Sequence, residues 1–303
     1  MKPAHLIYNP AAGRFPSRLL IERAAHVLRA QGWDIELMVA HNGEHIAHLS
    51  RAAAEAGAET VFIAGGDGSI NYALRGLLGS ETALAVLPAG TANVWAQEIG
   101  LPALGWTRWM ALEESARRYR QARLYRMDVG FCNQYPFLLW GGVGLDAFTV
   151  HRMEPRKRWE KQFAVAQYAA TVVQQAYTVG GLDLQVLTDS EQIRGRFLLA
   201  VASNIHLYAG GIAEISPSAR LDDGEMDLWL FAGDSLLEAL NHAWALWSGK
   251  HVHSEHARCI PFRELRLRST APLYVQVDGE PVTGDEEIHL RVEKQAISVL
   301  IPP

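Results

Sequence analysis

Apolar residues recur along the first third of the chain in two alternating patterns. Short continuous apolar runs, which are typical of buried strands, are separated by longer stretches with apolar positions at helical spacing. Strands that alternate with helices predict right-handed βαβ units and a mostly parallel sheet. The predicted strands are Ala4–Pro10, Trp33–Ala40, Thr60–Gly66 and Ala83–Pro88, and the predicted helices are Ser17–Gly32, Gly43–Gly57, Ile70–Gly79 and Thr91–Gly100.

The pattern changes after about residue 125, where strand-like segments follow one another directly. Alternation of apolar and polar positions is clear over Leu182–Val186 and Leu265–Leu267. Two helical stretches interrupt the strands, near Arg152–Val179 and Ser235–Lys250. Such a succession predicts a largely antiparallel second domain.

The fold prediction is therefore a two-domain chain. Residues 1–125 form an α/β domain around a mostly parallel sheet. Residues 126–290 form a largely antiparallel β domain. The 303 residues, of which 49% are hydrophobic and 20% charged, are enough to build both cores.

Charge and cysteine content narrow the class of protein. The formal net charge of −5 argues against a nucleic-acid binder. Two cysteines without a CxxC pair fit a reducing compartment and no structural zinc. The sequence shows neither a signal-peptide pattern nor an apolar run of the ~18 residues that a spanning helix needs. We expect a soluble, cytoplasmic protein.

The first candidate for chemistry is the stretch GGDGSINYAL, Gly65–Leu74, at the end of a predicted strand. Glycines let backbone amides approach an anion, and the following helix presents its positive end. The carboxylate of Asp67 would repel phosphate, so it fits there if Mg²⁺ lies between them or if it orders the loop. Ser69 is a candidate helix cap. The alternative is an ordinary strand-to-helix turn.

Two further turns follow predicted strands. The stretch Leu87–Gly100 has a Pro-Ala-Gly turn and opens a helix with Thr91 and Asn93, and NPAAGR, Asn9–Arg14, leaves the first strand. The carboxyl ends of parallel strands share one edge of a sheet, which is where ligands bind. Three such turns on one edge predict a nucleotide site.

An acidic turn lies in ARLDDGEMDLWLF, where Asp222, Asp223, Glu225 and Asp227 stand close together. Hard oxygen ligands at this density suit Mg²⁺ or Ca²⁺, although the spacing is not that of an EF-hand. A solvated Asp-Gly turn explains the local pattern equally well.

A second acidic pair, Asp278 and Glu280, flanks a glycine in VQVDGEPV. Two carboxylates at this spacing could supply a general base and a group that orients it. Taken alone, the pattern more often marks a hairpin turn.

Together these motifs resemble the diacylglycerol kinase catalytic family in its bacterial soluble form, which also includes sphingosine-type lipid kinases. The resemblance implies a three-layer α/β nucleotide-binding domain at residues 1–125 and a β-sandwich that binds the lipid or other substrate at residues 126–290. It also implies that the tail 291–303 returns to the first domain. The matching stretches, in the order typical of the family, are NPAAG, GGDGSIN, PAGTAN, DVGF, GVGLDA, YAGGIAEISPSARLDDGEMD and VDGEP.

The resemblance also implies roles for single residues. Asp67 and Asp128 would join a Mg²⁺ water network. Asp223 would hold a structural Mg²⁺ together with the carbonyls of Arg220 and Glu225. The predicted catalytic residues are Glu280 as proton acceptor, Asp278, Asp67 and Asp128. The predicted nucleotide-binding residues are Asn9, Gly65, Gly66, Asp67, Gly68, Ser69, Ile70, Asn71, Thr91 and Asn93.

Two positions depart from the family pattern. Many members carry an aspartate after the asparagine of the GTxN motif, where this chain has Val94. A threonine that is common after the second strand is absent from LMVAHNGEH. The first departure leaves the metal stoichiometry open, and the second leaves the adenine and ribose contacts open.

The predicted function is an ATP-dependent lipid kinase that transfers the γ-phosphoryl group to a lipid hydroxyl, with Mg²⁺ as cofactor. The alternatives are a kinase of the NAD kinase type and a nucleotide- or lipid-binding protein without turnover. The expected partners are a lipid substrate and a membrane surface contacted peripherally, with no nucleic acid, and a homodimer is one alternative for the oligomeric state.

Two helical stretches bear on contact with the membrane. His151–Val173 combines basic and aromatic residues that could dock on anionic headgroups, or it packs as a solvated helix. Leu236–Trp247 repeats apolar residues at helical spacing, which predicts core packing first and a lipid-chain pocket second.

Overall fold

The computed structural model describes residues 2–10, 18–102, 108–153, 180–189 and 191–303. The chain forms two compact units, one of Met1–Met127 with Gln295–Pro303 and one of Asp128–Lys294. The long strands β5 (Arg123–Cys132) and β17 (Glu287–Ile301) contribute residues to both units.

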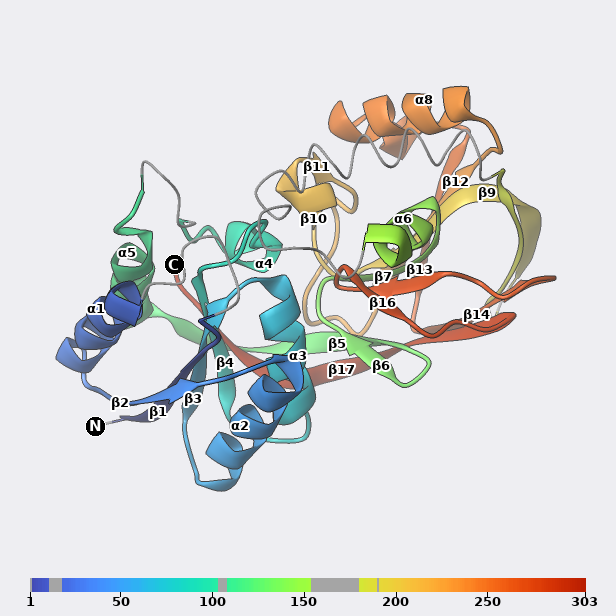
Figure 1. Cartoon of the computed structure of the whole chain (residues 1–303). Coiled ribbons are helices and arrows are strands. Elements are labelled where there is room, and N and C mark those ends of the chain that lie inside the picture. Colours follow the sequence, from blue (N-terminus) through green and yellow to red (C-terminus); the bar gives the residue numbers. More distant parts are fainter. Residues whose placement is uncertain (1, 11–17, 103–107, 154–179, 190) are drawn as a thin grey trace. The chain divides into compact units, whose positions relative to one another are not determined.

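The first unit is built on parallel strands in the order β2, β1, β3, β4. The end of β17 continues this sheet, because Val299 pairs in parallel with Leu84 of β4. Helix α1 packs beside α5 and α2 packs beside α3, one pair on each face of the sheet (Figure 1). The predicted three-layer α/β arrangement is confirmed. Its elements are β1 (Lys2–Tyr8), α1 (Arg18–Ala30), β2 (Trp33–Val39), α2 (Gly43–Glu55), β3 (Thr60–Gly65), α3 (Asp67–Leu77), β4 (Ala83–Pro88), α4 (Val94–Glu98), α5 (Ala111–Arg118) and η1 (Tyr119–Gln121).

Burial explains the two hydrophobic patterns of this unit. Every residue of β3 and β4 is buried, as expected for central parallel strands covered on both faces. Helix α1 buries one face through Ile21, Ala24 and Leu28. Helix α2 begins after Asn42, whose side chain accepts a hydrogen bond from the backbone N–H of His45 at 2.8 Å.

The second unit is antiparallel in all the strand pairs described within it. One run of strands has the order β16, β15, β7, β9, β8, β14, β17, and β9 also pairs with β12, which pairs with β13. The predicted antiparallel β-sandwich is confirmed. The elements are β6 (Tyr135–Phe137), β7 (Trp140–Gly144), α6 (Leu145–Met153), β8 (Leu182–Leu187), β9 (Gln192–Ser203), β10 (Leu207–Tyr208), η3 (Ala209–Gly211), β11 (Ala213–Glu214), β12 (Met226–Ala232), α8 (Leu236–Trp247), η4 (Lys250–His253), β13 (Ala257–Phe262), β14 (Glu264–Ser269), β15 (Val275–Val277) and β16 (Glu280–Val282).

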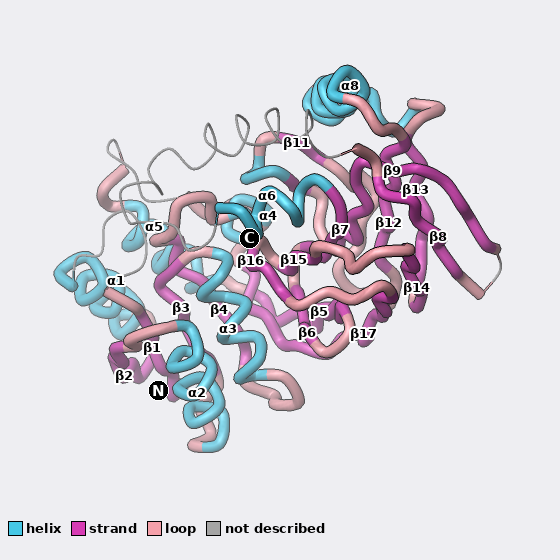
Figure 2. Tube along the Cα trace, turned by 45° about the vertical axis from the view of Figure 1, so that its right-hand side comes forward, coloured by secondary structure: helices cyan, strands magenta, loops and turns pink. Residues whose placement is uncertain are grey.

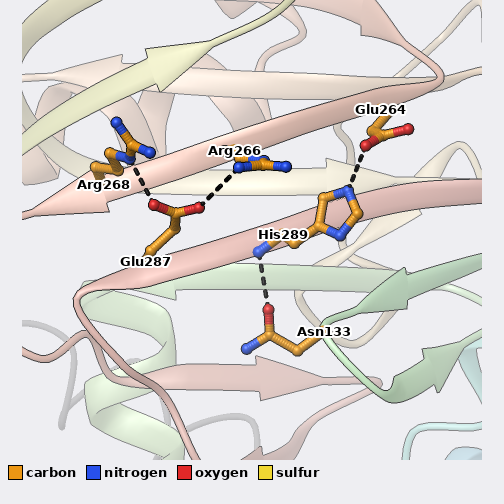
Figure 3. Close-up of polar contacts among 6 residues, drawn as sticks. All are labelled: Asn133, Glu264, Arg266, Arg268, Glu287 and His289. Atoms are coloured by element: carbon orange, nitrogen blue, oxygen red, sulfur yellow. Dashed lines mark hydrogen bonds and ion pairs between the residues drawn. The ribbon is translucent and has the colours of Figure 1, made fainter.

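Strands β14 and β17 show how alternation separates core from surface. Leu265 and Leu267 are buried, while the polar residues between them face outward. On that outer face, Glu264 pairs with His289 at 2.8 Å and Glu287 bridges Arg266 and Arg268 (Figure 3). Exposed pairs of this kind each contribute at most about 1 kcal/mol to the free energy of unfolding, so the buried leucines determine the register.

The prediction of core packing for Leu236–Trp247 is wrong. The helix forms as α8, and Ser235 and Glu238 make a capping box at its start. However, Leu237, Trp244 and Trp247 are 69%, 61% and 63% exposed. Figure 2 shows α8 at the margin of the strands of its unit.

Only the beginning of His151–Val173 falls within the described residues, as the end of α6, and 154–173 lies outside them. No helix in the described ranges is long and apolar enough to cross a membrane.

The cysteines provide a test of this packing. Burial raises the pKa of the Cys132 thiol to about 12, and burial together with the charge of Asp227 raises the pKa of Cys259 to about 12. At pH 8 such a thiol is ionised in only about one molecule in ten thousand. We expect both thiols to react very slowly with an aromatic disulfide reagent in the native protein and quickly after unfolding in guanidinium chloride. Rapid labelling of either thiol in the native protein would contradict the packing.

Candidate functional site

In the first unit, Asp67 joins the two glycine-containing loops that follow β3 and β4. It is the first residue of α3, and its carboxylate oxygens accept hydrogen bonds from the backbone N–H groups of Val94 and Trp95, each at 3.0 Å. Those N–H groups begin α4. Asp67 therefore caps a helix 27 residues further along the chain. This is the loop-ordering role that the sequence left open beside a role in metal binding.

The glycines of the two loops lie directly against each other. A Cβ atom added to Gly90 would lie 2.3 Å from the Cα atom of Gly66, and one added to Gly66 would lie 3.1 Å from the Cα atom of Gly90. A Cβ at Gly65 would lie 2.6 Å from the Ser69 hydroxyl. Glycine is required here for the close approach of the two loops as well as for any approach of phosphate.

Asn93 holds the second loop in shape. Its backbone is left-handed, with φ of 53°, a conformation that asparagine tolerates better than most residues. Its side chain accepts a hydrogen bond from the Gly90 N–H at 2.8 Å and donates one to the Gly90 carbonyl at 2.9 Å. The buried amide is thus used within the loop.

The remaining predicted nucleotide residues fall into two groups. Ile70 and Asn71 are buried, and the side-chain oxygen of Asn71 accepts a hydrogen bond from Nε of Arg75 at 3.1 Å. Their side chains therefore support α3. Gly68, Ser69 and Thr91 are half-buried in or beside the two loops, and Asn9 lies at the end of β1. The loop that follows Asn9 lies outside the described residues from 11 onward.

The electrostatics of the two loops depend on Asp67. Burial raises its pKa above the ordinary value, and the N–H groups of Val94 and Trp95 act in the opposite direction by stabilising the carboxylate. A carboxylate oxygen has more than one lone pair, so Asp67 keeps acceptor capacity beyond these two bonds.

In the second unit, Asp278 is a buried anchor. With Gly279 it forms a two-residue hairpin turn between β15 and β16, with φ angles of 48° and 82°. Its carboxylate accepts three backbone hydrogen bonds, from Leu138, Leu139 and Trp140, at 2.9, 2.8 and 3.1 Å. Glu280 follows at the first position of β16 and is half-buried. The structure therefore gives Asp278 a positioning role and leaves Glu280 as the residue that this turn presents.

Asn204, at the end of β9, extends this network. Its side-chain N–H groups donate to the carbonyls of Asp128 and Leu138 at 2.9 and 3.0 Å, and its backbone N–H donates to Leu139. Asp128 is fully buried, and its carboxylate accepts the Gly224 N–H at 2.6 Å. The network thus links the acidic turn to the hairpin that carries Glu280.

The acidic turn already contains a cation. The ammonium group of Lys294 lies 3.2 Å from the Asp223 carbonyl oxygen, and the lysine stem lies across Gly224. Asp223 accepts the Glu225 N–H at 3.0 Å, Glu225 pairs with Arg263, and Arg220 is exposed. In the part of the chain that the structure describes, no three His, Cys, Asp or Glu side chains form a metal cluster. The predicted ligand set combines one carboxylate with two backbone carbonyls, so this finding does not bear on it, and the Mg²⁺ site at this turn stays a prediction.

Comparison with known proteins shows which family this chain belongs to. Residues 3–132 match the diacylglycerol kinase catalytic domain, and residues 142–301 match the YegS C-terminal NAD kinase β-sandwich-like domain. The chain belongs to the diacylglycerol kinase catalytic family. The two matches together extend over most of both units and include the loops that carry Asp67, Asn93, Gly224 and Glu280, while Leu138–Trp140 lies between the two matched ranges.

Relatives of full length support this membership. A diacylglycerol kinase of Bacillus subtilis (strain 168) is 23% identical over 283 residues, which cover 92% of this chain and 90% of that protein. A probable lipid kinase YegS-like protein of Cronobacter sakazakii is 26% identical over 300 residues, covering 96% and 94%. A solved Bacillus anthracis str. Sterne structure shares the fold with a TM-score of 0.80 and 18% identity, covering 100% of this chain and 97% of that one.

Within this family, the departure at Val94 has a structural counterpart. Val94 is 1% exposed, so its side chain belongs to the core of the first unit. Its N–H group nevertheless donates to Asp67, which preserves the link between the loops. The missing aspartate therefore removes a charge without removing the helix cap.

Sequence reasoning missed Asn204 and the backbone segment Leu138–Trp140. The signal for Asn204 is weak, because a single asparagine at the end of an apolar strand usually marks a turn. The segment Leu138–Trp140 is apolar in sequence and contributes only backbone groups, so no side-chain motif indicates it.

The contact between the loops predicts a strong effect of Gly90→Ala. Its new Cβ would meet the Gly66 backbone, which cannot move like a flexible side chain, so we expect a loss of about 1–3 kcal/mol in the free energy of unfolding. Urea denaturation measures this loss. Gly79→Ala is the control, since it has nothing within 4 Å and only its φ of 79° is unfavourable. Equal stability of the two variants would contradict the loop contact.

Asp278→Asn should also destabilise the protein. Three backbone N–H groups now donate to the two carboxylate oxygens of Asp278, and the asparagine amide has only one oxygen to accept them. Each buried donor left unpaired costs about 1–3 kcal/mol. We expect a lower midpoint of thermal unfolding for Asp278→Asn, whereas Asp285→Asn, at an exposed position in the same segment, should leave it unchanged. A wild-type midpoint for Asp278→Asn would mean that the carboxylate is not an anchor.

Proposed function

We propose that this chain is an ATP-dependent lipid kinase that transfers the γ-phosphoryl group of ATP to the hydroxyl group of diacylglycerol or a related lipid. The observation that carries the proposal is the family match over both units, since the diacylglycerol kinase and YegS-type relatives named above are aligned over nearly their whole length.

The donor side of the reaction is assigned to the two loops of the first unit. The start of α3 supplies backbone N–H groups and the positive end of the helix dipole to the phosphates of ATP. Ser69 and Thr91 add hydroxyl groups beside these loops. Asp67 holds the loops together and, while ionised, retains lone pairs for the Mg²⁺ that accompanies ATP. When bound, that ion neutralises charge on the transferring phosphoryl group.

The acceptor side is assigned to the hairpin of the second unit. Glu280 removes the proton from the lipid hydroxyl group, which is a poor nucleophile while it is protonated. Asp278 holds the turn rigid through its three backbone hydrogen bonds, so it acts as a positioning residue. Asp128 fixes the Gly224 end of the same network.

Label transfer from ATP to a panel of acceptors tests the proposed reaction. The purified protein is incubated with Mg²⁺ and γ-labelled ATP, together with diacylglycerol in detergent micelles, with NAD, or without an acceptor. We expect label in the lipid extract alone and its loss when EDTA removes the metal. Label in the nucleotide product would favour the NAD kinase type, and a lack of turnover with every lipid tested would overturn the proposal.

Glu280→Gln is the sharpest test of the chemistry. Glutamine has nearly the same size but cannot accept the proton, so kcat should fall by about 10²–10⁴. The midpoint of thermal unfolding and the Kd for ATP should barely change. Glu286→Gln makes the same chemical change at an exposed position and should keep full activity. A Glu280→Gln enzyme with a normal kcat would show that the base lies elsewhere.

A further inference from the structure

Helix α8 carries an exposed apolar stripe, which we define as Leu237, Leu240, Trp244 and Trp247. Their exposed fractions are 69%, 45%, 61% and 63%. Spacings of three, four and three residues place them within about a quarter of the helix circumference. The rings of Trp244 and Trp247 lie 5.0 Å apart, so the two indoles form one continuous surface.

The opposite side of the helix is sufficient to hold it in place. His242 is the one residue of α8 that is buried; its ring lies 5.2 Å from that of Phe231 and its Nε2 lies 2.7 Å from the Ala232 carbonyl. The capping box of Ser235 and Glu238 fixes the first turn. The α8 stripe is therefore not needed for attachment to the sheet.

Helix α8 carries fewer charged residues than a helix that faces water usually does. Glu238 is the only acidic or basic residue among the 12 of α8, apart from the buried His242, and its carboxylate is held by Ser235 and the Asp234 N–H. Helices that face water usually carry charged residues on the outer side. On the C-terminal side, the next charged side chain is that of Lys250, which is exposed and follows Trp247 by three residues. On the N-terminal side it is that of Asp234, which is paired with Arg196 at 3.2 Å.

This combination has the chemistry of a membrane interface. Tryptophan side chains are enriched at the headgroup level, where an apolar ring with one N–H donor is well placed. An amphipathic helix lying in that plane buries leucine and tryptophan, while nearby lysine meets anionic headgroups. Exposed apolar residues elsewhere in the described chain, such as Trp109 and Leu124, do not share one helical stripe.

We propose that the α8 stripe docks this protein on the surface of a lipid bilayer, with Lys250 directed toward anionic headgroups. The inference rests on the proposed function in one respect, since a kinase of membrane lipids must reach an acceptor embedded in a bilayer. It adds the surface that makes the contact. The helix lies in the plane of the membrane interface, and its His242 side stays on the protein.

Vesicle binding without ATP tests this surface. The full chain is sedimented with vesicles of phosphatidylcholine and phosphatidylglycerol. The test variant is Leu237→Ser/Trp244→Ser, and the matched control is Trp109→Ser/Leu124→Ser, which removes one leucine and one tryptophan of similar exposure, 61% and 56%. We expect the test variant to bind at least about tenfold more weakly, since two large apolar side chains no longer enter the interface. The control should bind like the wild type.

Three results would overturn the proposal. The first is a wild-type protein that does not bind the vesicles, and the second is equal binding by the two double variants. The third is a wild type that is a dimer in analytical ultracentrifugation and a stripe variant that is a monomer. The last result would assign the stripe to a second copy of the chain. All four substituted side chains are exposed, so both double variants should keep the wild-type fold, and thermal unfolding checks this.

A separate assay distinguishes failure of docking from failure of the kinase proposal. With water-dispersed short-chain diacylglycerol, the stripe variant should phosphorylate as fast as the wild type, while turnover of diacylglycerol embedded in vesicles should fall with binding. If the wild type binds vesicles, the stripe variant does not, and neither protein turns over any lipid, the docking surface stands and the kinase assignment is overturned.

Discussion

The second unit is organised around one carboxylate, that of Asp278, which receives three backbone N–H groups from Leu138, Leu139 and Trp140. A buried negative charge is tolerated when its hydrogen bonds are satisfied, and here the donors come from the chain just before β7. Asn204 binds the carbonyls of the same segment and reaches Asp128, which in turn holds Gly224. One set of hydrogen bonds thus holds five places along the chain, namely Asp128, Leu138–Trp140, Asn204, Gly224 and Asp278.

The first unit uses a similar device at a different place. Asp67 receives two N–H groups from the start of α4, and the Gly66 and Gly90 backbones touch beneath it. In both units, an aspartate from a family motif holds backbone N–H groups of a segment that is distant in sequence. Asp67 and Asp278 therefore hold loops in place through backbone hydrogen bonds, whereas Glu280 is a half-buried carboxylate at the start of β16.

Much of the fold could be predicted from sequence because burial follows periodicity. The runs at β3 and β4 are apolar throughout and lie inside the sheet, and Leu265 and Leu267 alternate into the core. The motifs identified the loops. The partners of Asp67 and Asp278 could not be predicted, because they are backbone groups 27 and about 140 residues away that carry no side-chain signature. The exposure of helix α8 could not be predicted for a related reason, since the same apolar spacing occurs on helices packed in a core and on helices with an exposed apolar face.

The division of the chain into units has a consequence for its synthesis. Strand β17 delivers Ile297 and Val299 to the interior of the first unit, next to β4, although all the other strands of that sheet come from the first 127 residues. On a ribosome that emits the chain from its N-terminus, the first sheet has its β4 edge uncovered until the second unit has been translated. The first unit is therefore completed last, although its chain emerges first, and its nascent sheet keeps this edge open until β17 has been translated.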